Sequence, residues 1–473
     1  MQGRKNYQEK LFTNFQLSDR IPEDNFYRQL KGVLDLQFLY PATATYYGTE
    51  GQKSIDPVVF FKLMLVGYLE NQPSDRRIVS NSSMRLDILY FIGYDIEEQL
   101  PWHSTLSRTR QLYEEAVFNQ LFKAVLKQCI EKGMLSGRRQ AIDSVLVKAN
   151  ASMDSLKEKE VFEDALLYTK QLRESLDEEQ PHAGLVPSTE EKRGKRSNKT
   201  RTSTTDPDSR MAVKPGKVTK LNYLSQLSVD TESYVITHIG AFHADKRDSQ
   251  CLDTLLEKTS ENLQEHGLQI QEIIADTNYS SSEALQSLEN RGIKGYIPNT
   301  GTFKAEREGF GYDKENDRYV CSQGKSLKFS GYKNHHGISK VYLSKRSDCK
   351  DCPLKATCLG KAQQKTITSS LLKPLFDQMH QRMQSMTGRR MMKVRKSTVE
   401  PVIGTLVEYL GMRKVYTKGI GLANKCMLLA GMAYNLKKLL KYKARKAQIE
   451  TKAINDNLQA AFYRCGAHFI SYC

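Results

Sequence analysis

The chain has 473 residues, of which 39% are hydrophobic and 26% are charged. This composition is typical of a globular protein with more than one core. No apolar run reaches the roughly 18 residues that a membrane-spanning helix needs. The N-terminal residues MQGRKNYQEK are polar and lack the apolar core of a secretory signal. We therefore expect a cytoplasmic protein that does not contact a membrane.

The charge is strongly positive and unevenly distributed. Lys and Arg together number 71 against 54 for Asp and Glu, which gives a formal net charge of +17. Residues 361–446 hold 19 basic residues and only three acidic ones, Asp377, Glu400 and Glu408. A segment whose charges are almost all positive favours binding to an acidic partner, and nucleic acid is the first choice. The alternative is a solvated basic helix face without a partner.

Residues 1–135 are predicted to be mostly helical. One helix is expected near Ser54, where a Pro falls in the first turn, and another near Ser74. A third is expected within 101–133, with Pro101 as the break before it, Ser104 as its cap and Gly133 as its end. Such helices suit a helix-turn-helix DNA-binding domain and suit an ordinary helical cap equally well.

An α/β pattern begins at Arg139. Strands are expected at 139–150, 221–230, 233–242, 268–276 and 294–299, and helices at 249–266 and from Ser280. A polar insertion is expected at about 175–217. We therefore predict an α/β fold with five parts: helices over 1–135, a core over 136–300, a Cys-containing insertion over 301–365, basic helices over 366–448 and a tail over 449–473.

Three carboxylates stand in places that suggest metal chemistry. Asp143 lies inside an apolar strand, where an unpaired charge is costly. Asp276 ends a second apolar strand, and Glu400 lies in the basic segment. Three such carboxylates can hold two Mg²⁺ ions and support phosphodiester cleavage. The alternatives are a salt-bridged core acid at Asp143 and an ion pair between Glu400 and a neighbouring base.

Five motifs in order resemble those of bacterial insertion-sequence transposases of the DDE class, which have an RNase H-like core. They are AIDSVLVKANAS, STTDPDSR, HADKRDS, IADTNYSS and RKSTVEPVIGTL. The stretches GQKSIDPVVFFKLMLVGYLENQPSDRRIV and PWHSTLSRTR resemble the helical DNA-binding domain that such enzymes carry. The resemblance spans about residues 10–445. It implies a mixed sheet flanked by helices, with a helical N-terminal domain.

The resemblance also implies a site and a reaction. Asp143, Asp276 and Glu400 match the catalytic residues, which would bind two Mg²⁺ or Mn²⁺ ions for strand cleavage and strand transfer, with cut-and-paste as the default pathway. Arg395 and Lys396 compete for the place of a DNA-contacting Arg. Lys393 stands where a Tyr is common, and Val407 where a Lys is common. These departures leave open a decayed copy of the element.

DNA contacts are also expected in the N-terminal helices. Arg77, Arg85, Arg108 and Arg110 are candidates for phosphate contacts, with ordinary exposed arginines as the alternative. Asn150 and Asn278 lie near the carboxylates in the sequence and could form hydrogen bonds to DNA or to ligands, with a turn or capping role as the alternative. The expected partners are double-stranded DNA, as terminal inverted repeats and target, and a second copy of the chain in a homodimer on DNA. A nucleoid-associated location follows.

Four cysteines fall in the predicted insertion. Cys321, Cys349, Cys352 and Cys358 include one C-x2-C pair and resemble the Cys-rich insertion of this transposase group. A structural Zn²⁺ is one interpretation, with His335 and His336 as spare ligands, and a reduced, metal-free cluster is the other.

Three other functions remain open at this point. The first is a nuclease on the same core that cuts DNA without joining it. The second is a catalytically inactive DNA-binding remnant or repressor. The third is an RNA-processing enzyme, which competition between duplex DNA and structured RNA would distinguish.

Overall fold

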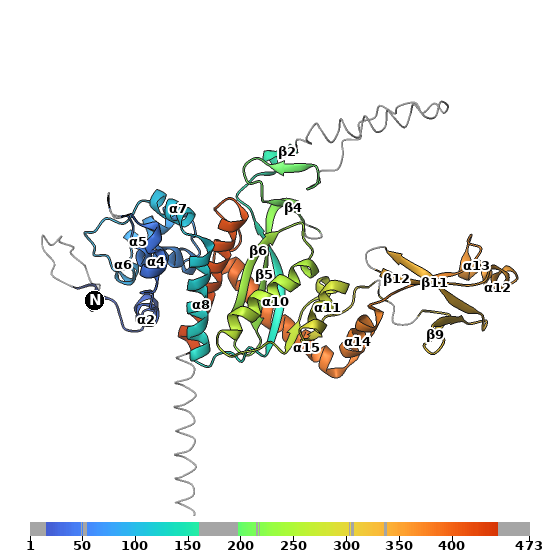
Figure 1. Ribbon diagram of the computed structural model, residues 1–473. Helices are drawn as coiled ribbons and strands as arrows, with labels where there is room; N and C mark the ends of the chain where they lie inside the picture. The colour runs from blue at the N-terminus through green and yellow to red at the C-terminus, as the bar shows by residue number, and fades with distance from the viewer. Residues whose placement is uncertain are drawn as a thin grey trace, which may run out of the picture.

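The computed structural model describes residues 16–442, with gaps at 49, 51–53, 160–196, 214–215, 217, 302, 304–306 and 335–337. The predicted tail over 449–473 and the first part of the predicted polar insertion, up to residue 196, lie outside the described residues, as do His335 and His336. Figure 1 shows helices at the N-terminal side, a central sheet with its helices, and a smaller sheet that projects from the centre. No helix in the described part of the chain is long and apolar enough to cross a membrane.

The N-terminal part is helical, as predicted. Its α-helices are α1 (Leu17–Arg20), α2 (Phe26–Val33), α3 (Leu39–Thr43), α4 (Pro57–Leu69), α5 (Asp75–Ser83), α6 (Leu86–Ile92), α7 (His103–Leu112) and α8 (Glu115–Glu131), with the short 3-10 turn η1 (Ala44–Tyr46). Helix α4 begins where the sequence places a Pro, at Pro57. The carboxylate of Asp56 accepts the N–H groups of Val58 and Val59 and caps it.

The prediction of one helix within 101–133 is wrong in two details. It is two helices, because Tyr113 between α7 and α8 has an extended backbone (φ −70°, ψ 133°). The Tyr113 ring is fully buried and stacks on Phe61 with the centroids 5.8 Å apart, so packing outweighs the local helical pattern. Helix α7 begins at His103 with Trp102 at its N-cap, so Ser104 is not the cap.

The central sheet has the strand order of an RNase H-like core. Its strands are β1 (Arg139–Lys148), β4 (Arg210–Ala212), β5 (Lys220–Asp230), β6 (Ile236–His243), β7 (Glu272–Ile274) and β8 (Lys294–Tyr296). The order is β6-β5-β1-β7-β8, with β4 also paired to β5. Strands β6, β5 and β1 are antiparallel neighbours, whereas β7 and β8 run parallel to β1. The predicted α/β fold class is thereby confirmed.

Helices cover the sheet and decide which way each side chain of β1 points. They are α10 (Asp248–Gln264), α11 (Ser282–Asn290), α14 (Lys373–Gln384) and α15 (Met386–Tyr409). Ile142 of β1 packs in one buried cluster with residues of α10, and Ala141 and Val145 belong to another that contains Val399 of α15. Because side chains alternate along a strand, Asp143 shares the side of Ala141 and Val145, toward α15.

A last helix, over 420–442, runs along the edge of β6. The side chain of Asn435 both accepts the N–H of Ile236 (2.9 Å) and donates to its carbonyl (2.8 Å), and Asn424 accepts the N–H of Ala241 (2.8 Å). These amides satisfy backbone groups that an edge strand otherwise leaves unpaired. Lys425 of this helix is buried and donates to the carbonyls of Arg110 and Tyr113, which ties the N-terminal helices to the core.

The smaller sheet forms the predicted insertion. Its strands are β9 (Phe310–Asp313), β10 (Arg318–Cys321), β11 (Ser326–Asn334), β12 (Ile338–Leu343) and β13 (Thr366–Ser370), each paired to its neighbour, with helices α12 (Arg346–Lys350) and α13 (Lys355–Leu359). Its own core is small: Tyr319, Leu327, Tyr342 and Ile367. The sheet extends past the expected limit of 365, because β13 pairs with β12 up to Ser370.

The described end of the predicted polar insertion folds against the core. Strand β3 (Arg201–Ser203) pairs with β2 (Leu156–Glu158), which follows the 3-10 turn η2 (Met153–Ser155). Asp206 is fully buried and accepts the hydroxyl of Tyr223 (2.7 Å) and the N–H of Gly419 (3.0 Å). Asp208 accepts the N–H of Ile420 (2.9 Å). The motif STTDPDSR therefore caps the helix over 420–442.

This cap predicts a stability effect. We expect Tyr223→Phe to lower the free energy of unfolding by about 1–3 kcal/mol, because it removes a donor to a buried carboxylate. The measurement is the urea midpoint followed by circular dichroism. Tyr416→Phe, at a half-exposed tyrosine, is the control. Equal midpoints for the two variants would contradict the role of Asp206.

Candidate active site

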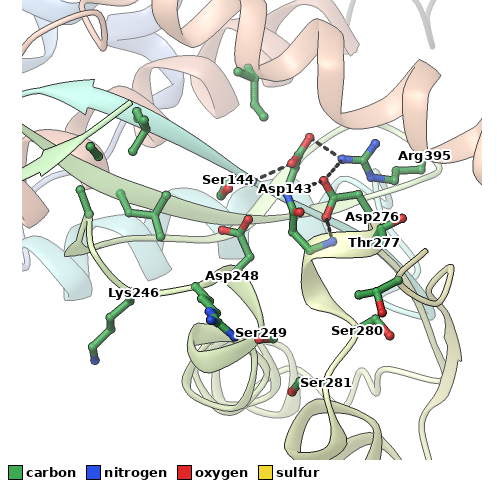
Figure 2. A pocket seen from close by; sticks show the side chains of 18 of the residues that line it. Asp143, Ser144, Lys246, Asp248, Ser249, Asp276, Thr277, Ser280, Ser281 and Arg395 are labelled. Atoms are coloured by element: carbon green, nitrogen blue, oxygen red, sulfur yellow. Dashed lines mark hydrogen bonds and ion pairs between the residues drawn. The ribbon is translucent and has the colours of Figure 1, made fainter. Parts of the chain in front are cut away.

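A pocket of about 950 Å³ opens beside the strand ends of the central sheet. Charged side chains of both signs contribute to its lining: Asp143, Lys246, Arg247, Asp248, Asp276, Arg395 and Glu400. Figure 2 shows the two aspartates pointing toward Arg395, while Lys246 extends away from them. The pocket thus gathers the three carboxylates predicted from the sequence, together with basic residues.

The strand register brings the two aspartates together. Strands β1 and β7 run parallel, with Ala141 opposite Ile274. Asp143 and Asp276 each follow two residues later, so they reach the same end of the sheet. Asp143 is 15% exposed at its side chain, and its Oδ1 accepts the N–H of Ser144 (2.8 Å). Burial raises the pKa of Asp143 to about 6, although the Arg395 guanidinium lowers it.

Asp276 is held by the turn that it begins. It is the N-cap of the 3-10 turn η3 (Thr277–Tyr279), and its Oδ1 accepts the N–H of Asn278 (3.0 Å). Its side chain is 32% exposed, and burial raises its pKa despite the nearby guanidinium of Arg395. The predicted position at the end of an apolar strand is therefore what presents this carboxylate to the pocket.

Helix α15 supplies a cation to the pair of aspartates. Arg395 is buried, and its Nη2 lies 2.8 Å from Asp143 Oδ2 and 3.6 Å from Asp276 Oδ2. Lys396 is exposed, so of the two competing bases it is Arg395 that faces the aspartates. The Nε–H of Arg395 is buried without an acceptor.

Glu400 lies on the same helix and lines the same pocket, but it is exposed. No three His, Cys, Asp or Glu side chains within the described ranges are close enough together to hold a metal ion. The structure therefore brings two of the predicted carboxylates onto one cation and leaves the third at the rim of the pocket. The assignment of these three as catalytic stays a prediction.

Sequence reasoning missed one acidic residue of the pocket. Asp248 is the first residue of α10, in the motif HADKRDS, and its negative charge raises the pKa of both Asp143 and Asp276. Its Oδ1 accepts the side-chain amide of the buried Gln226 (2.7 Å), which in turn accepts the hydroxyl of the buried Tyr279. An Asp in the first turn of a helix is common as a dipole partner, so the sequence alone did not single it out.

The two predicted asparagines behave differently. Asn278 lines the pocket and bonds to Asp276. Asn150 instead donates to the carbonyl of Tyr416 (3.1 Å) and is not among the pocket residues. Strand β1 carries Asn150 past the pocket to the segment after α15, so its nearness to Asp143 in the sequence does not bring it into the pocket.

The N-terminal arginines also divide into two groups. Arg77 and Arg108 are exposed and free to face DNA. Arg110 is buried in an ion pair with Asp75, and Arg85 pairs with Glu70 and Asp87. Arg110 is thus a structural residue, and expecting it to contact phosphate is wrong. Arg85 already has two carboxylate partners.

The four cysteines of the insertion share one cavity. Cys321, Cys349, Cys352 and Cys358 all line a space of about 30 Å³ and are free thiols. Ser344 Oγ lies 3.2 Å from Cys349 Sγ. These sulfurs come from β10, α12, α13 and the turn between the two helices. The fold thus brings Cys321 to the other three, although 27 residues separate it from Cys349. They do not form a group close enough to hold an ion, and the zinc site stays a prediction.

Two regions of the chain match models of transposase families. Residues 15–112 match a Transposase domain (DUF772), and residues 320–440 match a Transposase DDE domain. The second match includes Arg395 and Glu400 but neither aspartate. Both matches are to transposase families, and together they support a transposase function for the chain. No curated relative matches the chain.

Two solved structures are similar over much of the chain. One is a piggyBac transposase synaptic complex with hairpin DNA, 10% identical, with 88% of this chain and 74% of that chain covered and a TM-score of 0.33. The other is a Mos1 transposase paired-end complex with the left transposon end, 10% identical, with 59% and 73% covered and a TM-score of 0.17. Both scores are below 0.5, so the fold assignment depends on the strand order of the sheet.

The hydrogen bonds that support Asp248 give a testable prediction. Gln226→Leu removes the donor to Asp248 and leaves the buried hydroxyl of Tyr279 without its acceptor, which we expect to cost about 1–3 kcal/mol of unfolding free energy. Urea denaturation followed by fluorescence measures the loss. Gln269→Leu, at an exposed glutamine, is the control, and a midpoint for Gln226→Leu equal to that of the control would rule out this support.

Proposed function

We propose that this transposase cleaves DNA strands at the ends of an insertion sequence and joins them to target DNA, with Asp143, Asp276 and Glu400 as its catalytic carboxylates. One observation carries the proposal. Two aspartates from adjacent parallel strands share one cation from the helix that also bears Glu400. That helix lies within the match to the transposase DDE domain.

The donor set of the pocket suits a hard divalent ion. Carboxylate oxygens are the ligands that Mg²⁺ and Mn²⁺ prefer, and the aspartate pair already binds a cation, the guanidinium of Arg395. Asp143 and Asp276 would hold the metal, with Glu400 as the third ligand and two ions in all. When bound, such ions polarise the scissile phosphate and stabilise the leaving oxygen.

The protein's own residues bind and orient the DNA in this proposal. Lys246, Arg247 and Lys396 supply positive charge in or beside the pocket, and phosphate groups are attracted to such charge. Arg77 and Arg108 would contact the DNA at the N-terminal helices. The DNA would be the terminal inverted repeats and the target. Because two ends must be joined to one target, a homodimer on DNA is the expected assembly.

The carboxylates can be tested one at a time. We expect Asp143→Asn, Asp276→Asn and Glu400→Gln each to reduce strand cleavage by about a hundredfold or more, because each removes a negative ligand. Binding of the same DNA should persist. The substrate is a labelled duplex made from the inverted repeats that flank the gene, incubated with Mg²⁺ or Mn²⁺ and analysed on denaturing gels.

Two matched variants serve as controls for that experiment. Glu408→Gln changes an exposed acid on the same helix as Glu400, and Asp253→Asn changes an exposed acid on α10. Both should cleave as the wild type does. Full activity in Asp143→Asn would overturn the proposal. A nuclease without joining activity would cleave but fail to join a donor end with a free 3′-OH to a plasmid.

The N-terminal arginines predict a change in salt dependence. We expect Arg77→Ala combined with Arg108→Ala to weaken binding of duplex DNA and to reduce the slope of log K against log salt by about two, because two phosphate contacts are lost. Fluorescence anisotropy at several salt concentrations measures it. Lys127→Ala, at an exposed lysine of α8, should leave the slope unchanged if the contact surface is as proposed. An unchanged slope in the double variant would contradict that surface.

A further inference from the structure

The guanidinium of Arg395 stands between the two aspartates. One of its nitrogens, Nη2, lies within 2.8 Å of Asp143 and 3.6 Å of Asp276, and the side chain is only 10% exposed. The negative charges of the two aspartates are therefore paired with a cation that belongs to the chain itself. The contact joins β1, the end of β7 and α15, three segments that are far apart in the sequence.

A divalent ion held by both aspartates would need carboxylate oxygens that Arg395 now contacts. Two carboxylates that face one another repel unless a cation lies between them, and Asp248 adds a further negative charge nearby. Mg²⁺ demands a close shell of oxygen ligands. A guanidinium nitrogen and a divalent ion cannot both occupy the space between the same carboxylate oxygens. Either cation therefore excludes the other.

We propose that Arg395 is a built-in competitor of the divalent ion, which holds the aspartate pair together before metal loading and leaves it when metal binds. This inference rests on the proposed role of Asp143 and Asp276 as metal ligands. It makes Arg395 a positioning residue that sets the affinity of the site for metal, in addition to any contact with DNA.

The structure also indicates where the released guanidinium would bind. Its Nε–H is buried and has no acceptor while Nη2 pairs with the aspartates. A phosphate oxygen of DNA in the pocket would supply that acceptor, and Arg binds phosphate with two parallel hydrogen bonds. The pocket around it, about 950 Å³, is large enough for a nucleotide backbone segment. Metal loading would thus free an arginine for the substrate.

The test is metal affinity of the full chain without DNA. Mn²⁺ binding is measured by electron paramagnetic resonance for the wild type, Arg395→Met, Lys393→Met, Asp143→Asn and Asp276→Asn. We expect Arg395→Met to bind Mn²⁺ about tenfold more tightly than the wild type, because its competitor is gone. Lys393→Met removes one positive charge from an exposed position on the same helix and should change the affinity by less than about twofold.

The outcomes separate this inference from the proposed function. Mn²⁺ affinity in Arg395→Met that is equal to or weaker than the wild type, while Asp143→Asn and Asp276→Asn lose binding, would overturn the competition and leave the metal site intact. If both Asn variants bind Mn²⁺ as the wild type does, the aspartates are not the ligands. Both proposals then fail.

A measurement on the unaltered protein guards against misfolding of Arg395→Met. Phenylglyoxal modifies accessible guanidinium groups, and mass spectrometry of peptides reports each arginine separately. We expect modification of Arg395 to become several-fold faster when Mn²⁺ is added. Arg110, buried against Asp75, should stay protected, and the exposed Arg108 should react equally with or without Mn²⁺. An unchanged rate at Arg395 would overturn the inference.

Discussion

The site depends on one electrostatic constraint: two carboxylates at the end of a sheet need a cation between them. Asp143 and Asp276 meet because β1 and β7 are parallel neighbours in register, and burial raises the pKa of both. Arg395 supplies the cation from α15. The site therefore needs three features at once: the side of β1 on which Asp143 lies, the place where β7 ends, and the packing of α15 against the sheet. A change in any one of them would leave a buried charge unpaired.

The N-terminal helices and the central sheet share a core. One buried cluster extends from the N-terminal helices through β1 and β5 to the helix over 420–442. Lys425 adds hydrogen bonds from that helix to the break between α7 and α8. The exposed Arg77 and Arg108 are thus on elements packed against the sheet that bears the pocket. DNA held by the N-terminal helices would have a fixed relation to the aspartates, which suits cleavage at a set distance from a recognised end.

The insertion separates Glu400 from the aspartates in the sequence without disturbing the site. It forms its own sheet around a small core, and the chain returns to the central sheet through α14. Arg382 of α14 donates to the carbonyl of Gly295 on β8 (2.8 Å), and Met379 packs in the cluster of α10 and α11. These contacts fix the start of α15, and with it Arg395, regardless of the strands inserted before it. Because this core is small, a metal ion bound by the four cysteines would stabilise the insertion.

The sequence by itself predicted the helical character of the N-terminal part, the strands β1, β5, β6, β7 and β8 and the α/β class, because hydrophobic period and turn residues are local properties. It placed Asp143 in a strand and Asp276 at a strand end, and both positions are confirmed. Only the tertiary structure decided that Tyr113 breaks a helix, that Arg110 is buried, that Arg395 rather than Lys396 meets the aspartates and that Asp248 joins the pocket. Each of these depends on which surfaces pack together, and packing between different segments of the chain leaves no periodic signal in either segment alone.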